Sequence, residues 1–408
     1  MTAPPSPHAQ VVIDLGAIRH NVRRLRELVW GDPDPAGSTD GGQLMVVVKA
    51  DGYGHGMVPV ARAARSVGAQ WLGVATGAEA LALREAGDTG RVLCWLAAPG
   101  TDFTQLIGSG VDITANSVNQ LQEIARSARE AGHLAWVQLK FDTGLSRGGS
   151  PRSEWSELVH AARAAEQDGT IRVTGAWSHL ACSDEPQHPA NGAQSAAFDE
   201  ALALVAGAGL DPEVRHLANS AGAIWHPRTR HDLVRLGISA YGLSPAPDVR
   251  SEGQLGLVPA MTVRASVVLT KGLAAGAGVS YGHTFVASEP MRVALVPMGY
   301  GDGIPRHASS TAAVQVLGPG RSERALVLGR ICMDQFVVEA PHAQPGDEIL
   351  VFGPGDHGEP TAQDWAEWCG TINYEIVTRI GGRQRRRWVD SDRPGDSTGD
   401  STGTGDRA

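Results

Sequence analysis

The stretch MVVVK at residues 45–49 consists of four apolar residues closed by a lysine, and it is the first of eight similar runs. Each run is too short for a buried helix, and most are rich in β-branched or aromatic residues, which is typical of central parallel strands. The other seven are WLGVA (71–75), VLCWLA (92–97), VDITA (111–115), AWVQLKF (135–141), VTGAWSHL (173–180), EVRHLAN (213–219) and DLVRLGI (232–238).

The segments between these runs carry the signals of helices. Ser117 and Gln120 form an S-x-x-Q capping box ahead of apolar residues at helical spacing. Pro151 stands where the first turn of a helix tolerates the missing N–H. Eight strands alternating with helices predict a (β/α)8 TIM-like barrel over residues 10–250, and a doubly wound open sheet is the alternative.

The pattern changes after residue 250, where short strand-like runs are separated by Gly and Pro turns. This favours a mostly antiparallel β domain over residues 251–389. The low-complexity segment 390–408 lacks apolar side chains to bury and predicts a disordered tail, while a loop is expected at 31–42. The strand-like runs are MTVRASVVLT (261–270), MRVALVP (291–297), AAVQVL (312–317), ALVLGRI (325–331), QFVVE (335–339) and DEILVF (347–352).

The overall composition excludes several classes of protein. Among 408 residues, 35 Lys and Arg stand against 44 Asp and Glu, and the net charge of −9 argues against nucleic acid as the main partner. The four cysteines form no C-x-x-C pair, so neither a zinc site nor a redox motif is indicated. The N-terminus lacks the features of a signal peptide, and no apolar run reaches the roughly 20 residues that span a bilayer. We therefore expect a cytoplasmic protein with no membrane partner.

Lys49 closes the first apolar run, at the carboxyl-terminal end of a predicted barrel strand. Enzymes built on such barrels place their active sites at this end. Burying a lysine is costly, and desolvation lowers its pKa, so that a neutral amine becomes available as a nucleophile. The alternative is an ordinary strand-end lysine that extends into solvent.

A phosphate site is indicated beyond the last two runs. Asn219 and Ser220 follow the seventh run, and Gly237 and Ile238 end the eighth. Loops at these two places of a barrel commonly bind phosphate through backbone N–H groups at a helix N-terminus. The alternative is the ordinary use of such residues in turns and caps.

Three further charged or titratable residues lie in or near the strands. Arg235 lies inside the eighth run and needs a partner, because arginine keeps its charge. Arg147 follows the fifth run and His179 lies near the end of the sixth, and a structural salt bridge is the alternative for each. A metal cluster of His179, Asp184 and His188 is a further alternative, but no third strong ligand appears at motif spacing, so we expect no metal.

Nine strings of the sequence occur in an order that closely resembles bacterial alanine racemase, a fold-type III pyridoxal-phosphate enzyme. The resemblance covers roughly residues 10–380, and nine strings across two domains make it highly specific. They are VVKADGYGHG (47–56), LKFDTGLSRGG (139–149), SHL (178–180), HLANSAG (216–222), VRLGISAYG (234–242), VSYG (279–282), GYGDG (299–303), RICMDQ (330–335) and TINYE (371–375).

The resemblance implies a two-base racemisation of alanine on pyridoxal 5′-phosphate. Lys49 would carry the cofactor and act as the base on D-alanine, and Tyr281 would be the base on L-alanine. Two bases on opposite faces explain how a proton leaves one side of a carbon and returns on the other. The product would supply D-alanine for peptidoglycan.

The resemblance also implies roles for other residues. Arg235 would face the pyridine nitrogen, supported by His179. Lys140 matches a lysine that is carbamylated in some relatives. The phosphate would be held by Tyr53, Ser220, Gly237, Ile238 and Tyr374, the substrate carboxylate by Arg147 and the backbone of Met333, and the substrate entrance would be narrowed by Tyr300 and Tyr374.

In this family the β domain of one subunit completes the barrel site of the other, which implies a head-to-tail homodimer. Two rival classes resemble only part of the pattern: a non-catalytic single-barrel cofactor-binding protein, and an amino-acid decarboxylase with a barrel and a β domain. A third is a metal-dependent hydrolase using His179 and His188.

The sequence departs from the family pattern in places. Gly301 stands where relatives often have alanine, and Leu145 where many have methionine. The arginine-rich run GGRQRRRW (381–388) matches no recognised motif, and we expect it to form a solvated face.

Overall fold

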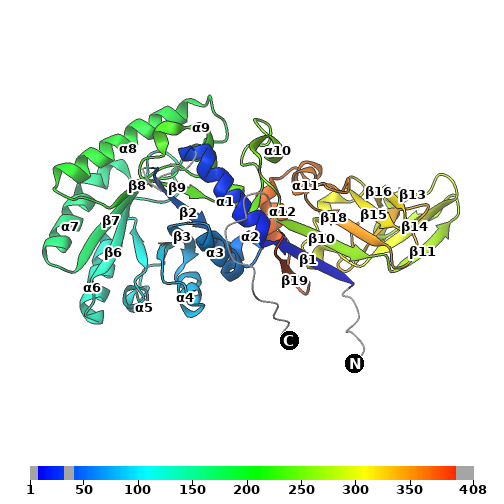
Figure 1. The fold of residues 1–408 in the computed structure, drawn as a ribbon, viewed down its shortest axis with the longest axis horizontal. Coiled ribbons are helices and arrows are strands. Elements are labelled where there is room, and N and C mark those ends of the chain that lie inside the picture. The colour runs from blue at the N-terminus through cyan, green and yellow to red at the C-terminus, as the bar shows by residue number, and fades with distance from the viewer. Residues whose placement is uncertain (1–7, 32–40, 392–408) are drawn as a thin grey trace.

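The computed structural model describes residues 8–31 and 41–391, and they fold into a barrel and a β-rich unit that lie side by side along the long axis (Figure 1). Most of the loop expected at 31–42 and of the tail expected at 390–408 falls outside the described residues. Within the described residues, no helix is long and apolar enough to cross a bilayer.

All eight predicted runs are parallel strands of one sheet, in the order β8-β7-β6-β5-β4-β3-β2-β9 across the described part of the chain. The ends of the sheet also meet, because Asp232 N donates to Arg215 O (3.1 Å) and Arg235 N to Ala218 O (3.1 Å). The sheet is therefore a nearly closed barrel and not the open sheet considered as the alternative. The strands are β2 (Gln43–Val47), β3 (Trp71–Thr76), β4 (Arg91–Leu96), β5 (Asp112–Ala115), β6 (Ala135–Lys140), β7 (Ile171–Trp177), β8 (Val214–His216) and β9 (Leu233–Leu236).

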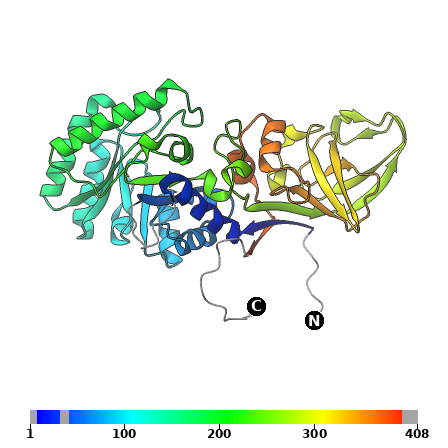
Figure 2. The same cartoon turned by 45° about the horizontal axis from the view of Figure 1, so that its top comes forward.

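Helices cover the outside of the barrel (Figure 2). Ser117 caps one of them by accepting from Gln120 N (3.2 Å), but the Gln120 side chain accepts from Asn116 N (2.8 Å), which differs from the predicted reciprocal box. Pro151 precedes a short 3-10 turn (Arg152–Glu154) that leads into α7. The helices are α1 (Leu15–Trp30), α3 (Met57–Ser66), α4 (Gly77–Glu85), α5 (Thr104–Gly108), α6 (Val118–Ala131), α7 (Trp155–Gln167), α8 (Pro189–Gly207) and α9 (Ser220–Trp225).

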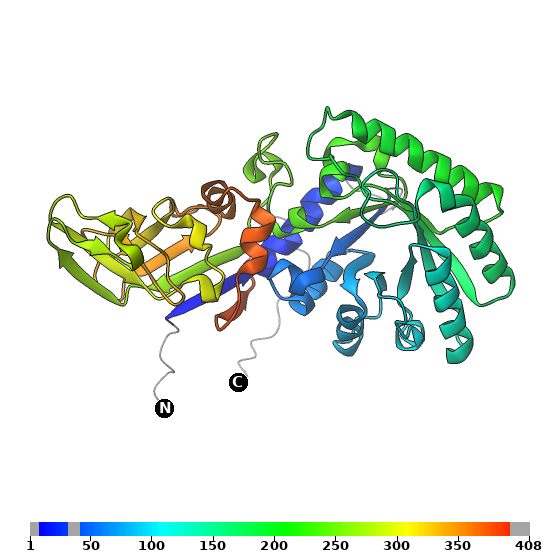
Figure 3. The same cartoon turned by 180° about the vertical axis from the view of Figure 1, so that it is seen from behind.

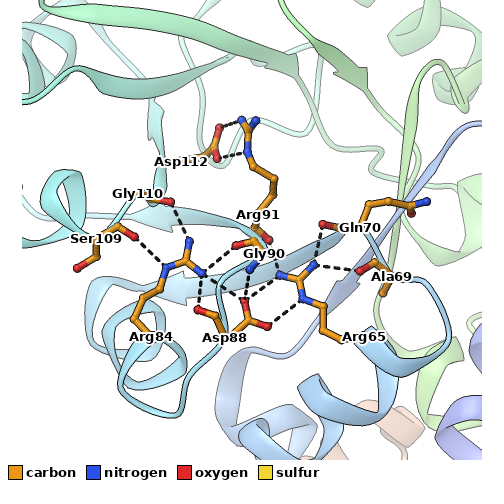
Figure 4. A network of polar contacts seen from close by, with 10 residues as sticks. All are labelled: Arg65, Ala69, Gln70, Arg84, Asp88, Gly90, Arg91, Ser109, Gly110 and Asp112. Atoms are coloured by element: carbon orange, nitrogen blue, oxygen red, sulfur yellow. Dashed lines mark hydrogen bonds and ion pairs between the residues drawn. The ribbon is translucent and has the colours of Figure 1, made fainter.

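Arginines close the amino-terminal end of the barrel (Figure 4). Arg65 and Arg84 both bind the Asp88 carboxylate and also donate to backbone carbonyls at or just before the starts of neighbouring strands. Arg91 binds Asp112, which is fully buried inside the barrel, at 2.7 Å. Because these carbonyls would otherwise lack partners, the arginines stabilise the end of the barrel opposite to the site.

The second unit is a nine-stranded sheet of the described residues, in the order β11-β14-β17-β16-β15-β18-β10-β1-β19. Its pairs are antiparallel except β1 with β19, which confirms a mostly antiparallel β domain. Neither β1 nor β19 is expected from the sequence pattern, and β1 joins this sheet although it precedes the barrel. The strands are β1 (Ala9–Asp14), β10 (Met261–Ser266), β11 (Leu269–Leu273), β14 (Met291–Val296), β15 (Ala313–Gly318), β16 (Arg321–Leu328), β17 (Phe336–Glu339), β18 (Glu348–Phe352) and β19 (Arg385–Val389).

Three smaller features complete the unit. A hairpin of β12 (Gly278–Val279) and β13 (Phe285–Val286) lies at the end of the unit away from the barrel (Figures 1 and 3). Helices α11 (Ala362–Cys369) and α12 (Asn373–Arg379) lie nearer the barrel, and Asn373 Nδ2 donates to Ser244 O (3.0 Å).

Candidate active site

Lys49 lies directly beyond β2, at the carboxyl-terminal end of the barrel, and begins the short α2 (Lys49–Tyr53). This element is a left-handed turn, because Ala50, Asp51 and Tyr53 have φ near +52° and Gly52 has φ 61°. Each non-glycine residue in this conformation costs about 1–2 kcal/mol. Such a conformation persists only where surrounding contacts fix it.

The surroundings of Lys49 favour a neutral amine. Burial, followed by the charge of Arg147, lowers the pKa of Lys49, and Glu79 opposes this shift. The amine lies 5.9 Å from the ring centres of Tyr53 and Trp95. A partly desolvated lysine of lowered pKa is suited to forming a Schiff base with an aldehyde.

Tyr53, Ser220 and Gly237 form a small cradle, and the ring centre of Tyr53 lies 5.9 Å from the Lys49 amine. Ser220 Oγ accepts from Gly237 N at 2.8 Å, and a side chain at Gly237 would lie only 2.7 Å from the Tyr53 hydroxyl. Ile238 begins a 3-10 turn and Ser220 begins α9, so N–H groups of two turn starts converge here. The glycine, the hydroxyls and the N–H groups at the starts of these two turns suit a phosphate.

Asn219 has an ordinary role in this region. Its Oδ1 caps α9 by accepting from Gly222 N (2.9 Å) and also accepts from Ser183 Oγ (2.8 Å). The Tyr53 ring lies 6.3 Å from that of Tyr374 on α12, so the second unit contributes one aromatic wall to the cradle.

Arg235 is buried inside the barrel and is held by five contacts. Its Nη2 donates to Ser178 O and Leu217 O (both 2.8 Å), and Nη1 donates to His216 O (3.1 Å). The same nitrogens contact two ring nitrogens, Nδ1 of His216 at 2.8 Å and Nδ1 of His179 at 3.2 Å. The salt bridge considered as an alternative is therefore absent among the described residues, and neutral acceptors hold the cation.

A column of buried polar side chains continues from Arg235 through the barrel. His216 Nε2 contacts Gln138 Oε1 at 2.7 Å, and Gln138 Nε2 donates to Asp112 Oδ1 at 3.5 Å. Asp112 then binds Arg91 at the other end of the barrel (Figure 4). Because Nδ1 of His216 accepts from Arg235, its Nε2 carries the proton. Sequence reasoning missed His216, Gln138 and Asp112, whose only signal is a polar residue within an apolar strand.

Lys140 and His179 lie close to Arg235. Burial, then the charges of Arg235 and Arg147, lowers the pKa of Lys140 to about 8. The Lys140 amine lies 4.4 Å from the centre of the Trp177 ring. Burial, then Arg235, lowers the pKa of His179 well below its usual value, so the ring is neutral. Arg147 itself lies on the exposed loop beyond β6.

Tyr281, Tyr300 and Met333 belong to the second unit, where they follow β12, β14 and β16, whereas Lys49 follows β2 of the barrel. The two units lie at opposite ends of the molecule (Figures 1 and 3). They line one hollow of about 710 Å³ whose walls come only from residues 269–337. Tyr281 is 73% exposed and Met333 54%, which is unusual for side chains of this size. The loops of this hollow are fixed to each other, because Tyr300 N donates to Cys332 O (3.0 Å) and Gly301 N to Met333 O (2.9 Å).

The described residues contain no group of three His, Cys, Asp or Glu side chains that could hold a metal ion. The metal-dependent hydrolase is therefore not supported. A lysine of lowered pKa, a phosphate cradle and a buried arginine at the carboxyl-terminal end of a barrel fit pyridoxal phosphate. With the attached β domain, they define the class of pyridoxal-phosphate enzymes built from a barrel and a β domain.

Comparison with known proteins identifies the family within this class. The N-terminal domain model of alanine racemase matches residues 13–245, and its C-terminal domain model matches residues 260–388. The chain belongs to the alanine racemase family, whose members use pyridoxal phosphate to interconvert L-alanine and D-alanine, and this is the reaction of the present chain. The match to both domains also excludes the single-barrel proteins.

Individual relatives agree over nearly the whole chain. Alanine racemase of Salinispora tropica is 50% identical over 388 residues, which cover 95% of this chain and 99% of that protein. Alanine racemase of Streptomyces coelicolor is 50% identical and covers 93% of this chain and 96% of its own. The crystal structure of alanine racemase from Streptomyces lavendulae has a TM-score of 0.90 at 48% identity, covering 95% of this chain and 98% of that one.

Proposed function

We propose that racemisation here uses Lys49 as the base on the D-alanine side and Tyr281 of a second subunit as the base on the L-alanine side. The observation that carries this proposal is the separation of the two residues within one chain. Lys49 lies in the barrel, whereas Tyr281 is exposed in a hollow to which no barrel residue contributes. A head-to-tail homodimer brings the hollow of each chain over the barrel of the other.

Several residues of the barrel would hold the cofactor, which supplies an electron sink for the carbon that loses its proton. Arg235 would face the pyridine nitrogen as a fixed hydrogen-bond donor, supported by His179. Because arginine keeps its protons, it would leave that nitrogen unprotonated and the electron sink weak. The phosphate would be held by Tyr53, Ser220, Gly237, Ile238 and Tyr374, with Asn219 capping the helix that begins at Ser220.

The substrate is oriented from both subunits. Arg147 and the backbone of Met333 bind its carboxylate, and Tyr300 and Tyr374 narrow the entrance. Lys140 lies near Arg147 and has a pKa of about 8, so that a sizeable fraction is neutral near pH 8. A neutral amine is the form that reacts with carbon dioxide, and we assign carbamylation to Lys140.

We place the enzyme in the cytoplasm, where its D-alanine is available for peptidoglycan. The four cysteines are free thiols, which suits a reducing compartment.

Reductive trapping tests the assignment of Lys49. The chain has three lysines, Lys49, Lys140 and Lys271. Borohydride treatment of the cofactor-loaded enzyme, followed by peptide mapping, is expected to label Lys49 alone. Label on Lys140 or Lys271, or a Lys49→Ala variant of undiminished activity, would contradict the proposal. A racemisation assay on each L-amino acid defines how far activity extends from alanine to serine.

A further inference from the structure

The arginine-rich run at 381–388 was expected to be a solvated face, but it contacts both halves of the molecule. Arg383 binds Asp302 (2.9 Å) and Asp334, and Arg386 binds Asp51. Trp388 Nε1 donates to His55 O at 2.9 Å. We call Arg383, Arg386 and Trp388 the clasp.

The two faces of β19 carry different side chains with different surroundings. Side chains alternate along a strand, so Arg386 and Trp388 share the face toward the turn of Lys49, while Arg385 and Arg387 share the opposite face. Arg385 and Arg387 are exposed, whereas the Arg386 side chain is 25% exposed. Parallel pairing of β19 with β1 fixes this register. The chain therefore offers a matched arginine on each side of the same strand.

The turn that begins at Lys49 needs external support because it is left-handed. Asp51 supplies much of this support, since its Oδ1 accepts from Met57 N (2.9 Å) while its Oδ2 accepts from Arg386. Asp51 O also accepts from Gly56 N at 2.8 Å. At the other side, Glu79 Oε1 accepts from Ala50 N at 2.7 Å. Arg386 thus neutralises and orients the carboxylate that closes the turn.

Two C-terminal elements pack against the end of the turn. A side chain at Gly56 would meet the Trp388 ring of β19 at 2.8 Å, and one at Gly54 would meet Val377 O of α12 at 2.5 Å. Packing against β19 and α12 together restricts relaxation of the left-handed turn.

Arg383 fixes the other half of the site. Asp302 is buried, and it accepts from Gly299 N (3.0 Å) as well as from Arg383 and Gln384. Asp334 directly follows Met333. Arg383 therefore joins the Tyr300 turn to the Met333 loop, both of which line the hollow of the β domain.

We propose that the clasp is a positioning device for racemisation, in which Arg386 acts on Lys49 through Asp51 and Arg383 acts on Tyr300 and Met333 through Asp302 and Asp334. The second half rests on the proposed dimer, because those loops then serve the partner subunit's barrel. A single segment links the Lys49 turn of one site to the loops of the other.

Hydrogen exchange of the cofactor-free protein tests the role of Arg386. In Arg386→Ala, amides of residues 50–57 are expected to exchange about threefold faster, as loss of an ion pair with a half-exposed carboxylate predicts, and the dissociation constant for pyridoxal phosphate should rise about threefold. Arg387→Ala is the matched control and should change neither. Arg386→Lys should restore part of both, and Asp51→Asn should reproduce Arg386→Ala.

The possible results of these measurements distinguish a positioning role of Arg386 from general unfolding. Unchanged exchange at 50–57 in Arg386→Ala would overturn the proposal, as would faster exchange with unchanged cofactor affinity. Amides of β5 and β6 should keep their exchange rates, which excludes general unfolding. If Arg386→Ala does not fold, Arg386→Lys and Asp51→Asn provide the same two readouts. A failure of the proposed function appears separately, as borohydride labelling away from Lys49 in the unsubstituted enzyme.

Discussion

Replacing His216 with phenylalanine tests the polar column that holds Arg235. The substitution keeps a ring against Trp177, with which His216 stacks at 5.4 Å. It removes the acceptor for Arg235 Nη1 (2.8 Å) and the bond to Gln138 (2.7 Å). One lost bond is charge-assisted and the other is neutral, so the free energy of unfolding should fall by about 2–4 kcal/mol.

The pH dependence of stability should change as well. Burial, then Arg235, lowers the pKa of His216 well below its usual value. The folded protein therefore keeps His216 neutral, while the unfolded chain binds a proton below about pH 6.5. Stability from this group is complete above that pH and is lost as the pH falls, with a slope of about 1.4 kcal/mol per pH unit. In His216→Phe, the dependence of the unfolding free energy on pH below about 6.5 should be less steep by this amount.

Urea unfolding of the cofactor-free protein at pH 7.5, 6.0 and 5.0 measures both effects. His216→Asn is the control, because asparagine keeps an acceptor near the Nδ1 position and does not titrate. It should lose the slope but retain more of the unfolding free energy at pH 7.5 than His216→Phe. A His216→Phe protein with unchanged stability at pH 7.5 and an unchanged slope would refute the column as described.

Two further substitutions separate the roles at the site. Tyr281→Phe should slow racemisation in both directions, because the equilibrium constant is one, but exchange of the α-proton with solvent should be lost chiefly from L-alanine. Equal loss of α-proton exchange from both enantiomers would contradict its role as the base on L-alanine. Arg235→Glu should raise transamination relative to racemisation, because a carboxyl group favours a protonated pyridine nitrogen; an unchanged partition between the two products would count against the assigned partner of the cofactor.

Much of the fold was predictable because the barrel strands are continuous apolar runs. Both faces of a central parallel strand are buried, so MVVVK and its seven counterparts stand out against the helices between them. The positions of Lys49, Ser220, Arg235 and Gly237 near one end of the barrel follow from that pattern.

The strands β1 and β19 could not be predicted in the same way. Gln10 pairs with Arg385 and Ala9 with Ala265, so each pairing depends on residues hundreds of positions apart. The charged run at 385–387 also looks like a solvated surface. Its real signal was alternation, with every second side chain bonded to the barrel.

Two parts of the site could not be predicted from the sequence, for physical reasons. The left-handed turn at residues 50–53 includes alanine and tyrosine, which rarely adopt it, and only tertiary contacts hold it there. The polar column depends on His216 and Gln138 facing each other across the barrel, and no local pattern encodes that distance.

A site shared between two subunits can be tested by mixing inactive chains. Lys49→Ala and Tyr281→Ala are each expected to be inactive as homodimers. A heterodimer isolated through two different affinity tags would contain one intact site, with Lys49 from one chain and Tyr281 from the other. It should recover about half of the activity of the unsubstituted dimer. A heterodimer as inactive as its parents would contradict the account.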